Sequence, residues 1–271
     1  MNHKPRFPER IVCLTEETTE TLYLLGEDSR IVGISGFTVR PARARREKPR
    51  VSAFTSAKID RIIELRPDLV LGFSDLQADI AAELVRAGIE VHVFNHRSVV
   101  EILRTIAVLG GMIGCEAKAA ALVDRLSAGL AAVRERAARL PARPRVYFEE
   151  WDEPQISCIR WVSELIGIAG GDDCFPELAR QALGKHRIIA DPLEVPRRAP
   201  DIILGSWCGK KFRADSVKQR PGWQEVPAVR NDQLFEIKSS LILQPGPAAL
   251  TDGVAEIEKA IAEWARSLGE R

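Results

Sequence analysis

Short apolar runs alternate with helix-patterned stretches along the first part of the chain. The runs at 10–14, 31–35, 69–73 and 89–94 show little alternation, as expected for strands buried on both faces of a parallel sheet. The stretches with helical spacing are 15–26, 59–65, 78–87 and 99–113. Strands that alternate with helices predict a parallel sheet covered by helices. We therefore expect an N-terminal α/β lobe over residues 1–113.

Residues 115–140 have the composition of one long helix. They contain no proline and a single glycine, Gly129, and consist mostly of the strong helix formers Ala, Leu, Arg and Glu. The apolar residues at helical spacing are Ala121, Leu122, Leu126, Leu130 and Val133. A proline ends a helix at the preceding residue, so Pro141 sets the limit. We predict a spine helix over 114–141.

The strand and helix pattern restarts after this helix. The predicted strands are 145–148, 202–205 and 233–237, and the predicted helices are 159–169 and 250–268. Residues 64–72 (ELRPDLVLG) resemble residues 197–205 (RRAPDIILG), so Pro-Asp precedes a buried strand at the same place in each half. The predicted fold class is α/β, with two lobes that each hold a parallel sheet flanked by helices. The spine helix joins them, and the second lobe covers 142–271.

Composition and charge exclude several classes of protein. The chain is 45% apolar and 28% charged, which is ordinary for a globular protein, and its net charge of +1 does not suit nucleic acid. No apolar run reaches about 18 residues, so no transmembrane helix is expected. The five cysteines are scattered without C-x-x-C or zinc spacing, which favours reduced thiols and no metal site.

Recognised catalytic signatures are absent from the sequence. There is no H-E-x-x-H, P-loop, G-x-S-x-G or G-x-G-x-x-G that opens a helix. The acids at 149, 150, 152 and 153 can supply paired carboxylates for acid–base work, or form a charged loop that binds ligand amides or water. His96 ends a predicted strand and is either a metal ligand or a hydrogen-bonded structural histidine. We expect no catalytic residue and no cofactor.

Residues just beyond the strands are the candidate ligand contacts, because ligands bind outside the carboxyl ends of parallel strands. From the first lobe they are Thr15, Glu17, Phe37, Phe54, Phe73 and His96. From the second lobe they are Glu150, Trp151, Trp207, Lys210, Ser239 and Ser240. Large aromatic residues in loops suggest a flat apolar ligand surface, although each ring can instead fold back onto the core.

Two basic stretches have open interpretations. Residues 40–50 hold six basic residues and two prolines, and form either a site for an anionic ligand or partner or a solvated loop. Lys210 and Lys211 either pair with an anionic ligand substituent or are ordinary surface lysines. Gly209 alone does not make them part of a phosphate-binding loop, since the earlier glycine of that motif is missing.

The chain resembles the class III, spine-helix group of substrate-binding proteins that serve ABC importers of cobalamin, ferric siderophores and haem. The resemblance rests on 10–14 with Thr18 and Glu20, on 31–35, on 59–71, on the spine and on the second Pro-Asp strand. It is closest to the cobalamin-binding members, in which aromatic residues line a cleft between the lobes, and Phe37, Phe54 and Phe73 match those positions. The stretches 148–152, 206–211 and 243–247 also resemble sequences labelled cobalamin-binding.

This resemblance implies a monomeric, non-catalytic protein that captures a large planar metal complex, most readily a corrinoid. Group members dock on a permease through one acid on each lobe. The matching acid is Asp60 in the first lobe and, one residue out of register, Glu194 in the second. The start of the chain lacks a secretory signal, so the chain as written is expected in the cytoplasm, and in the periplasm if a signal was removed. The alternative is a cytoplasmic enzyme or metal-complex chaperone, or a siderophore or haem binder, on this scaffold.

Overall fold

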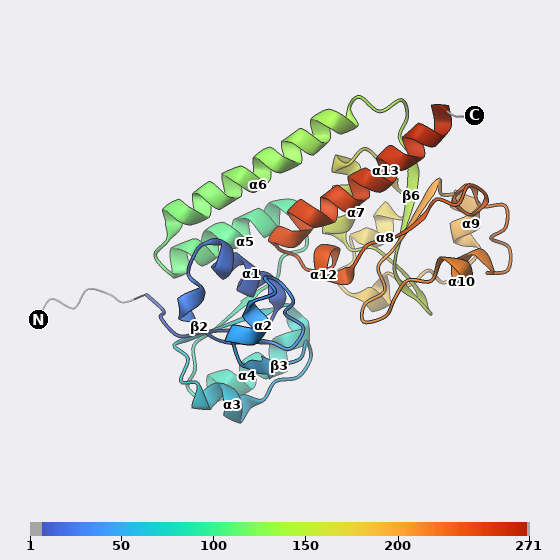
Figure 1. Ribbon diagram of the computed structural model, residues 1–271. Helices are drawn as coiled ribbons and strands as arrows, with labels where there is room; N and C mark the ends of the chain where they lie inside the picture. Colours follow the sequence, from blue (N-terminus) through green and yellow to red (C-terminus); the bar gives the residue numbers. More distant parts are fainter. Residues whose placement is uncertain (1–6, 270–271) are drawn as a thin grey trace, which may run out of the picture. The chain divides into compact units, whose positions relative to one another are not determined.

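A computed structural model describes residues 7–269, and their contacts divide the chain into two compact units (Figure 1). Unit 1 contains the chain up to His96 together with Val100–Leu126. Unit 2 contains Arg97–Val99 and the chain from Ser127 onward. Each unit has its own sheet, and the predicted α/β fold is confirmed. None of the helices within residues 7–269 combines the length and apolarity that crossing a bilayer requires.

Unit 1 follows the predicted order of elements closely. Its strands are β1 (Ile11–Cys13), β2 (Ile31–Ser35), β3 (Arg50–Ser52), β4 (Leu69–Phe73) and β5 (Val91–Phe94). Its helices are α1 (Glu16–Leu24), α2 (Ala44–Glu47), α3 (Ile59–Glu64), α4 (Ala78–Arg86) and α5 (Val99–Met112), with 3₁₀ turns η1 (Asp28–Arg30) and η2 (Asp75–Gln77). The stretch expected to be a loop at 40–50 contains α2 and the start of β3. Both elements are only three or four residues long and carry charged residues, so periodicity did not reveal them.

The unit 1 sheet has the order β3-β2-β1-β4-β5, and every neighbouring pair is parallel. The central strands β1 and β4 are buried along their whole length, which explains their unbroken apolar sequences. Val12, Val70 and Val51 pack with Ile62 of α3 and Leu84 of α4 in one apolar cluster. All five strands therefore end at the same edge, and the loops that follow them share that edge.

The long helix α6 spans Glu116–Ala137, shorter than the predicted 114–141 because residues 138 and 139 form a turn. The division between the units falls within it, between Leu126 and Ser127. Its buried face consists of Ala119, Leu122, Leu126, Leu130 and Val133. The inclusion of Ala121 in that face was wrong. Ala121 is exposed, because one residue is a rotation of about 100° from Leu122, whereas Ala119 lies three residues away on the same side.

Unit 2 contains more short elements than its sequence predicted. Its strands are β6 (Arg145–Asp152), β7 (Gln155–Ser157), β8 (Asp172–Asp173), β9 (Ile202–Gly205) and β10 (Leu234–Glu236). Its helices are α7 (Arg160–Ile168), α8 (Pro176–Ala179), α9 (Glu194–Arg198), α10 (Ala214–Lys218), α11 (Pro227–Arg230), α12 (Ser239–Ile242) and α13 (Val254–Gly269), with a 3₁₀ turn η3 (Gly184–His186) and a π-helical segment η4 (Ala249–Gly253). The two long helices α7 and α13 match the predicted ones.

The unit 2 sheet has the order β10-β9-β6-β7, and β8 also pairs with β6. β9, β10 and β8 are parallel to their neighbours, but β7 runs antiparallel to the end of β6. The stretch 149–152, expected to be an exit loop, is therefore strand. Its acids and Trp151 belong to a β6–β7 hairpin, which a charged sequence did not indicate. Helix α13 packs beside β9 and α7, and Arg136 of α6 pairs with Glu258 of α13 at 2.5 Å.

The five cysteines are all reduced, as expected from their spacing. Cys13, Cys115 and Cys158 are buried, and burial raises the pKa of Cys13 to about 12. Cys174 is half-buried and Cys208 is exposed.

Candidate functional site

The six candidate residues of unit 1 lie along the carboxyl edge of its sheet. Four of them stand two residues beyond a strand end: Thr15 after β1, Phe37 after β2, Phe54 after β3 and His96 after β5. Phe73 is the last residue of β4, and Glu17 lies in the first turn of α1. The parallel strand order brings these loops to one edge of unit 1, which is where the sequence placed a ligand.

Glu17 is a buried acid with an open hydrogen-bonding position. The Thr15 hydroxyl donates to Oε1 of Glu17, while Oε2 has no hydrogen-bond partner within residues 7–269. Burial raises the pKa of Glu17 to about 8 and that of the neighbouring Glu16 to about 7. Glu17 therefore carries a proton at neutral pH and can donate it to an acceptor. Thr15 is the N-cap residue of α1, but its hydroxyl donates to Glu17 and does not cap the helix.

The three phenylalanines of this edge differ in how much ring they present. Phe37 is 56% exposed, Phe54 is half-buried, and Phe73 is 6% exposed. The Phe73 ring meets the ring of buried His96 edge to face, with centroids 5.1 Å apart. Phe37 is thus the ring of the three with most surface free for a flat molecule. Phe73 and His96 are buried at the ends of β4 and β5, on the other side of β1 in the sheet order.

Gln77, which sequence reasoning missed, holds this edge together. It is fully buried; its Oε1 accepts the Phe73 N–H at 2.9 Å, and its Nε2 donates to the Phe54 carbonyl at 2.8 Å. A Cβ on Gly72 would lie 3.0 Å from Oε1 of Gln77, so the glycine makes room for it. Gly72, the next-to-last residue of β4, was a visible signal, but nothing in the sequence identified Gln77 as its neighbour.

In unit 2, three of the six candidates lie together: Lys210, Trp151 and Trp207. The Lys210 ammonium lies 4.4 Å from the Trp151 ring centre, 5.0 Å from that of Trp207, and 2.5 Å from Asp152. Trp151 is half-buried, whereas Trp207 is 4% exposed and packs against Phe212 with ring centres 5.0 Å apart. The buried Trp207 ring therefore contacts Lys210 from the side of the core, and the Trp151 ring is the more accessible of the two to a ligand.

The acids of β6 are engaged by arginines. Glu149 is fully buried and accepts from both terminal nitrogens of Arg220 (2.6 and 2.8 Å), from the Trp207 indole at 2.9 Å and from the Tyr147 hydroxyl at 3.0 Å. Glu150 receives a two-pronged contact from Arg187, at 2.5 and 2.9 Å. Because each carboxylate has its own arginine, the pair is arranged as structural ion pairs and not as an acid beside a base.

Ser239 and Ser240 occupy the first positions of α12, which follows β10, and both are half-buried. Other elements of unit 2 form a cavity of about 860 Å³ that the sequence did not suggest. Its wall includes Ile188, Leu193 and Trp223, together with the turn between β6 and β7.

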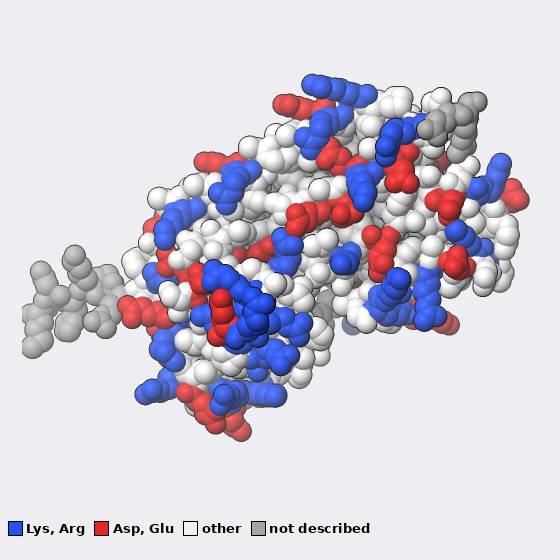
Figure 2. All heavy atoms as spheres, viewed as in Figure 1, with Lys and Arg blue, Asp and Glu red and all other residues white. Residues whose placement is uncertain are grey.

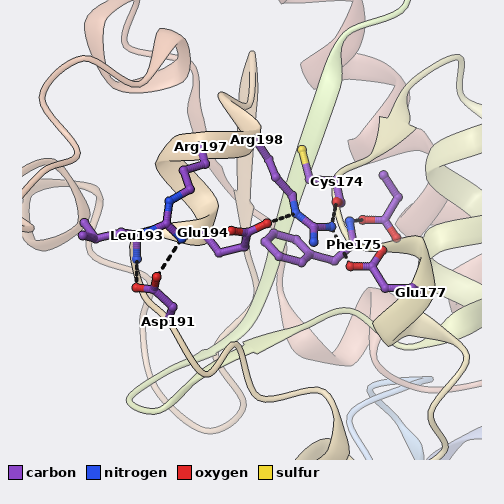
Figure 3. A network of polar contacts seen from close by, with 9 residues as sticks. Cys174, Phe175, Glu177, Asp191, Leu193, Glu194, Arg197 and Arg198 are labelled. Atoms are coloured by element: carbon purple, nitrogen blue, oxygen red, sulfur yellow. Dashed lines mark hydrogen bonds and ion pairs between the residues drawn. The ribbon is translucent and has the colours of Figure 1, made fainter.

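The two expected docking acids have different surroundings, and Figure 3 shows those of Glu194. Asp60 lies exposed in the first turn of α3 and forms no ion pair within residues 7–269. Glu194 is held by Arg197 at 3.1 Å and by Arg198 at 3.0 Å, and Arg197 also pairs with Asp191. The side chain of Glu194 is therefore already neutralised by arginines of its own helix.

Comparison with known proteins identifies the family. Residues 11–241 match the model of the periplasmic binding protein family. The chain belongs to the periplasmic binding protein family. It is accordingly a substrate binder of that type, and the resemblance drawn from the sequence is confirmed.

Two curated relatives of this family member carry informative names. An uncharacterized ABC transporter substrate-binding lipoprotein of Bacillus subtilis is 26% identical over 94% of the chain and 80% of its own length. A cobalamin-binding protein of Halobacterium salinarum is 28% identical over 73% of the chain, which spans about half (51%) of that relative's length.

Two solved structures have the same fold. The periplasmic vitamin B12 binding protein of Vibrio cholerae superposes with a TM-score of 0.77 at 22% identity, covering 96% of this chain and 99% of the other. A periplasmic heme-binding protein from Roseiflexus superposes with a TM-score of 0.78 at 23% identity, covering 93% and 99%. At this identity the likeness extends to the fold and not to the ligand.

Proposed function

We propose that this periplasmic binding protein captures a large planar metal complex for an ABC importer, and that the complex is a corrinoid. The observation that carries the proposal is the exposed ring of Phe37, which stands with Phe54 and Phe73 at one edge of an all-parallel sheet. The name of the Halobacterium salinarum relative supports a corrinoid over other macrocycles. The names of the relatives also support a role in transport and not in catalysis.

The chemistry of the unit 1 edge suits such a ligand. A corrin ring has flat apolar faces, for which an exposed phenylalanine is a suitable contact. Its rim carries amide groups, whose carbonyl oxygens accept hydrogen bonds. The protonated carboxyl of Glu17 can donate to one of them. A buried donor without an acceptor costs free energy, so an acceptor on the ligand would be favoured at this position. In unit 2, we propose that Trp151, Lys210, Ser239 and Ser240 supply further ligand contacts.

We also propose a permease partner and a location outside the cytoplasm. The Bacillus subtilis relative is named as an ABC transporter lipoprotein, which supports the periplasmic alternative over the cytoplasmic one. Asp60 is the acid better placed to meet a partner's arginine, since Glu194 is occupied by Arg197 and Arg198. We therefore propose that the protein docks on its permease through Asp60, either alone or together with an acid of unit 2 other than Glu194.

The test is a calorimetric titration with cyanocobalamin, cobinamide and hemin in parallel. Wild type should bind both corrinoids more tightly than hemin. Phe37→Ala should weaken corrinoid binding about tenfold, equivalent to about 1.4 kcal/mol, while Phe37→Trp should restore it. Because Phe37 is largely exposed, neither change should alter the melting temperature.

Val85→Ala is the matched control, since Val85 is 59% exposed on α4 and is not one of the candidate contacts. No response of wild type to either corrinoid would refute the proposed ligand. Tight binding of hemin alone would replace the corrinoid with a haem while retaining the binding role.

A further inference from the structure

Unit 1 contains a second concave feature, a cavity of about 680 Å³ near the ends of β2 and β3. Four basic side chains line it: Arg45, Lys48, Arg50 and Lys58. Ser52 and Ser56 also line the cavity, and the Ser52 hydroxyl donates to the Leu14 carbonyl at 3.5 Å. No acidic residue is among its lining residues, all of which fall in the described stretch 36–58. Figure 2 shows the Lys and Arg side chains gathered over this part of unit 1.

Three short elements bring these cations together. Helix α2 carries Arg45, and the chain leaves it through Lys48 into β3, which begins at Arg50. Ser52 then pairs with Ala57 across a tight turn, and the Lys58 N–H donates to the Val51 carbonyl at 2.8 Å. This turn returns the chain beside β3, so Lys58 lies close to Arg50 although eight positions separate them.

Two other arginines of the same loop, Arg40 and Arg43, have acidic partners, whereas the basic lining residues do not. Arg40 pairs with Glu20 at 2.8 Å, and Arg43 pairs with Asp28 at 3.2 Å and with Glu47 at 3.3 Å. Glu47 also accepts from the Tyr23 hydroxyl, which directs its carboxylate to Arg43 and Tyr23. Within residues 7–269, Arg45, Lys48, Arg50 and Lys58 form no ion pair.

We propose that this cavity is a binding site for a multiply charged oxyanion, namely a small molecule that bears phosphate or several carboxylates. Four like charges around one concavity repel one another, and an anion with two or more charges removes that repulsion. The two guanidinium groups suit oxyanions because each can bind two oxygens at once, and the Ser56 hydroxyl can donate a further hydrogen bond. The volume is within the ordinary range for a small-molecule site.

This proposal does not depend on the corrinoid proposal. The lining residues include none of the aromatic candidates, although Gly36 and Ala53 precede Phe37 and Phe54 directly. The chain's net charge of only +1 also argues against a general attraction to polyanions, so the four cations act as a local feature. A concave site with hydroxyl groups favours a discrete small molecule over an extended anionic surface.

The experiment is a calorimetric titration of the full chain with pyrophosphate and with citrate at fixed ionic strength. The double variant Arg45→Gln/Arg50→Gln should weaken binding at least tenfold, because each arginine contributes a charge-assisted contact. Arg46→Gln is the matched control, since Arg46 is exposed on the same helix and does not line the cavity. It should change affinity by less than about twofold.

Binding of pyrophosphate alone, or of citrate alone, with loss in the double variant supports the site and identifies its anion class. The absence of binding by wild type to either anion would overturn the proposal. An equal loss in Arg46→Gln would also overturn it, because the effect would then be one of general charge. Both arginines are exposed, so circular dichroism melts should be unchanged and should separate loss of the site from loss of the fold.

Discussion

Asp68 accepts the backbone N–H of Arg10 through its carboxylate at 2.8 Å, and its own N–H donates to the Arg10 carbonyl at 2.9 Å. Unit 2 repeats the arrangement. Asp201 accepts the Arg145 N–H at 2.9 Å and donates to the Arg145 carbonyl at 2.8 Å. In both units the Pro-Asp aspartate fastens the start of the first strand to the start of its parallel neighbour, β1 to β4 and β6 to β9.

The residues before the two prolines also match. Arg66 and Ala199 both have left-handed backbones, with φ of 46° and 45°. The Pro-Asp repeat recognised in the sequence is therefore a structural device, which ends a helix and sets the register of a parallel strand pair. It leaves the opposite, carboxyl edge of each sheet for function.

Replacement of either aspartate should lower stability without affecting ligand binding. Asp68→Ala and Asp201→Ala each remove a carboxylate that accepts a backbone N–H, and each should cost about 1 kcal/mol of the free energy of unfolding. Urea unfolding measures the loss. Asp124→Ala, at an exposed position of α6, is the control and should change stability much less. Equal losses of stability at all three positions would contradict the role of Asp68 and Asp201 in joining the two strands.

Gln77 should be required for the order of the unit 1 edge. Gln77→Ala leaves the Phe73 N–H and the Phe54 carbonyl without their buried partner, which should cost about 2–3 kcal/mol. Hydrogen exchange should increase at Phe73 and around Phe54 more than in the β10–β9 pair of unit 2. Uniform protection changes in both units would mean that Gln77 acts only through global stability.

The buried acids of α1 predict a defined pH dependence. The pKa values of Glu16 and Glu17 rise from 4.5 to about 7 and about 8 because burial disfavours their charged forms. The folded chain thus binds these protons more tightly than the unfolded chain. The stability they contribute is complete below pH 4.5 and declines as the pH rises toward 8. Glu17→Gln should make that decline shallower.

Urea midpoints at pH 5 and pH 8.5 test this expectation. Glu116→Gln, at the exposed first residue of α6, should retain the wild-type decline. If Glu17→Gln and wild type lose the same stability across this range, the proton on Glu17 does not contribute.

Glu150 should affect stability more than affinity. The Arg187 side chain is 3% exposed, and Glu150 is its acidic partner at 2.5 Å. Glu150→Ala therefore leaves a buried guanidinium without compensation, at a cost of about 3 kcal/mol. Thermal unfolding measures this cost, and a titration with cyanocobalamin at a temperature where the variant is folded measures affinity. A large loss of affinity without loss of stability would return Glu150 to the ligand contacts.

The sequence was sufficient for the features that depend on local pattern. Unbroken apolar runs identified β1, β2, β4 and β9, because strands buried on both faces cannot alternate. The positions of Thr15, Phe37, Phe54 and His96 beyond strand ends followed from the same pattern. Their role in binding stays a prediction, but their common edge is a consequence of parallel topology.

Only the tertiary structure decided which polar groups have partners. Glu149 and Glu150 read as a free acidic loop, yet arginines 71 and 37 residues further along the chain neutralise them. Arg43 and Arg45 look alike in the sequence, yet one meets Asp28 and Glu47 while the other lines an anion-sized cavity. Periodicity reports which face of an element is buried. The partner of a charge depends on long-range packing, because a carboxylate and a guanidinium distant in sequence meet only when the chain has folded.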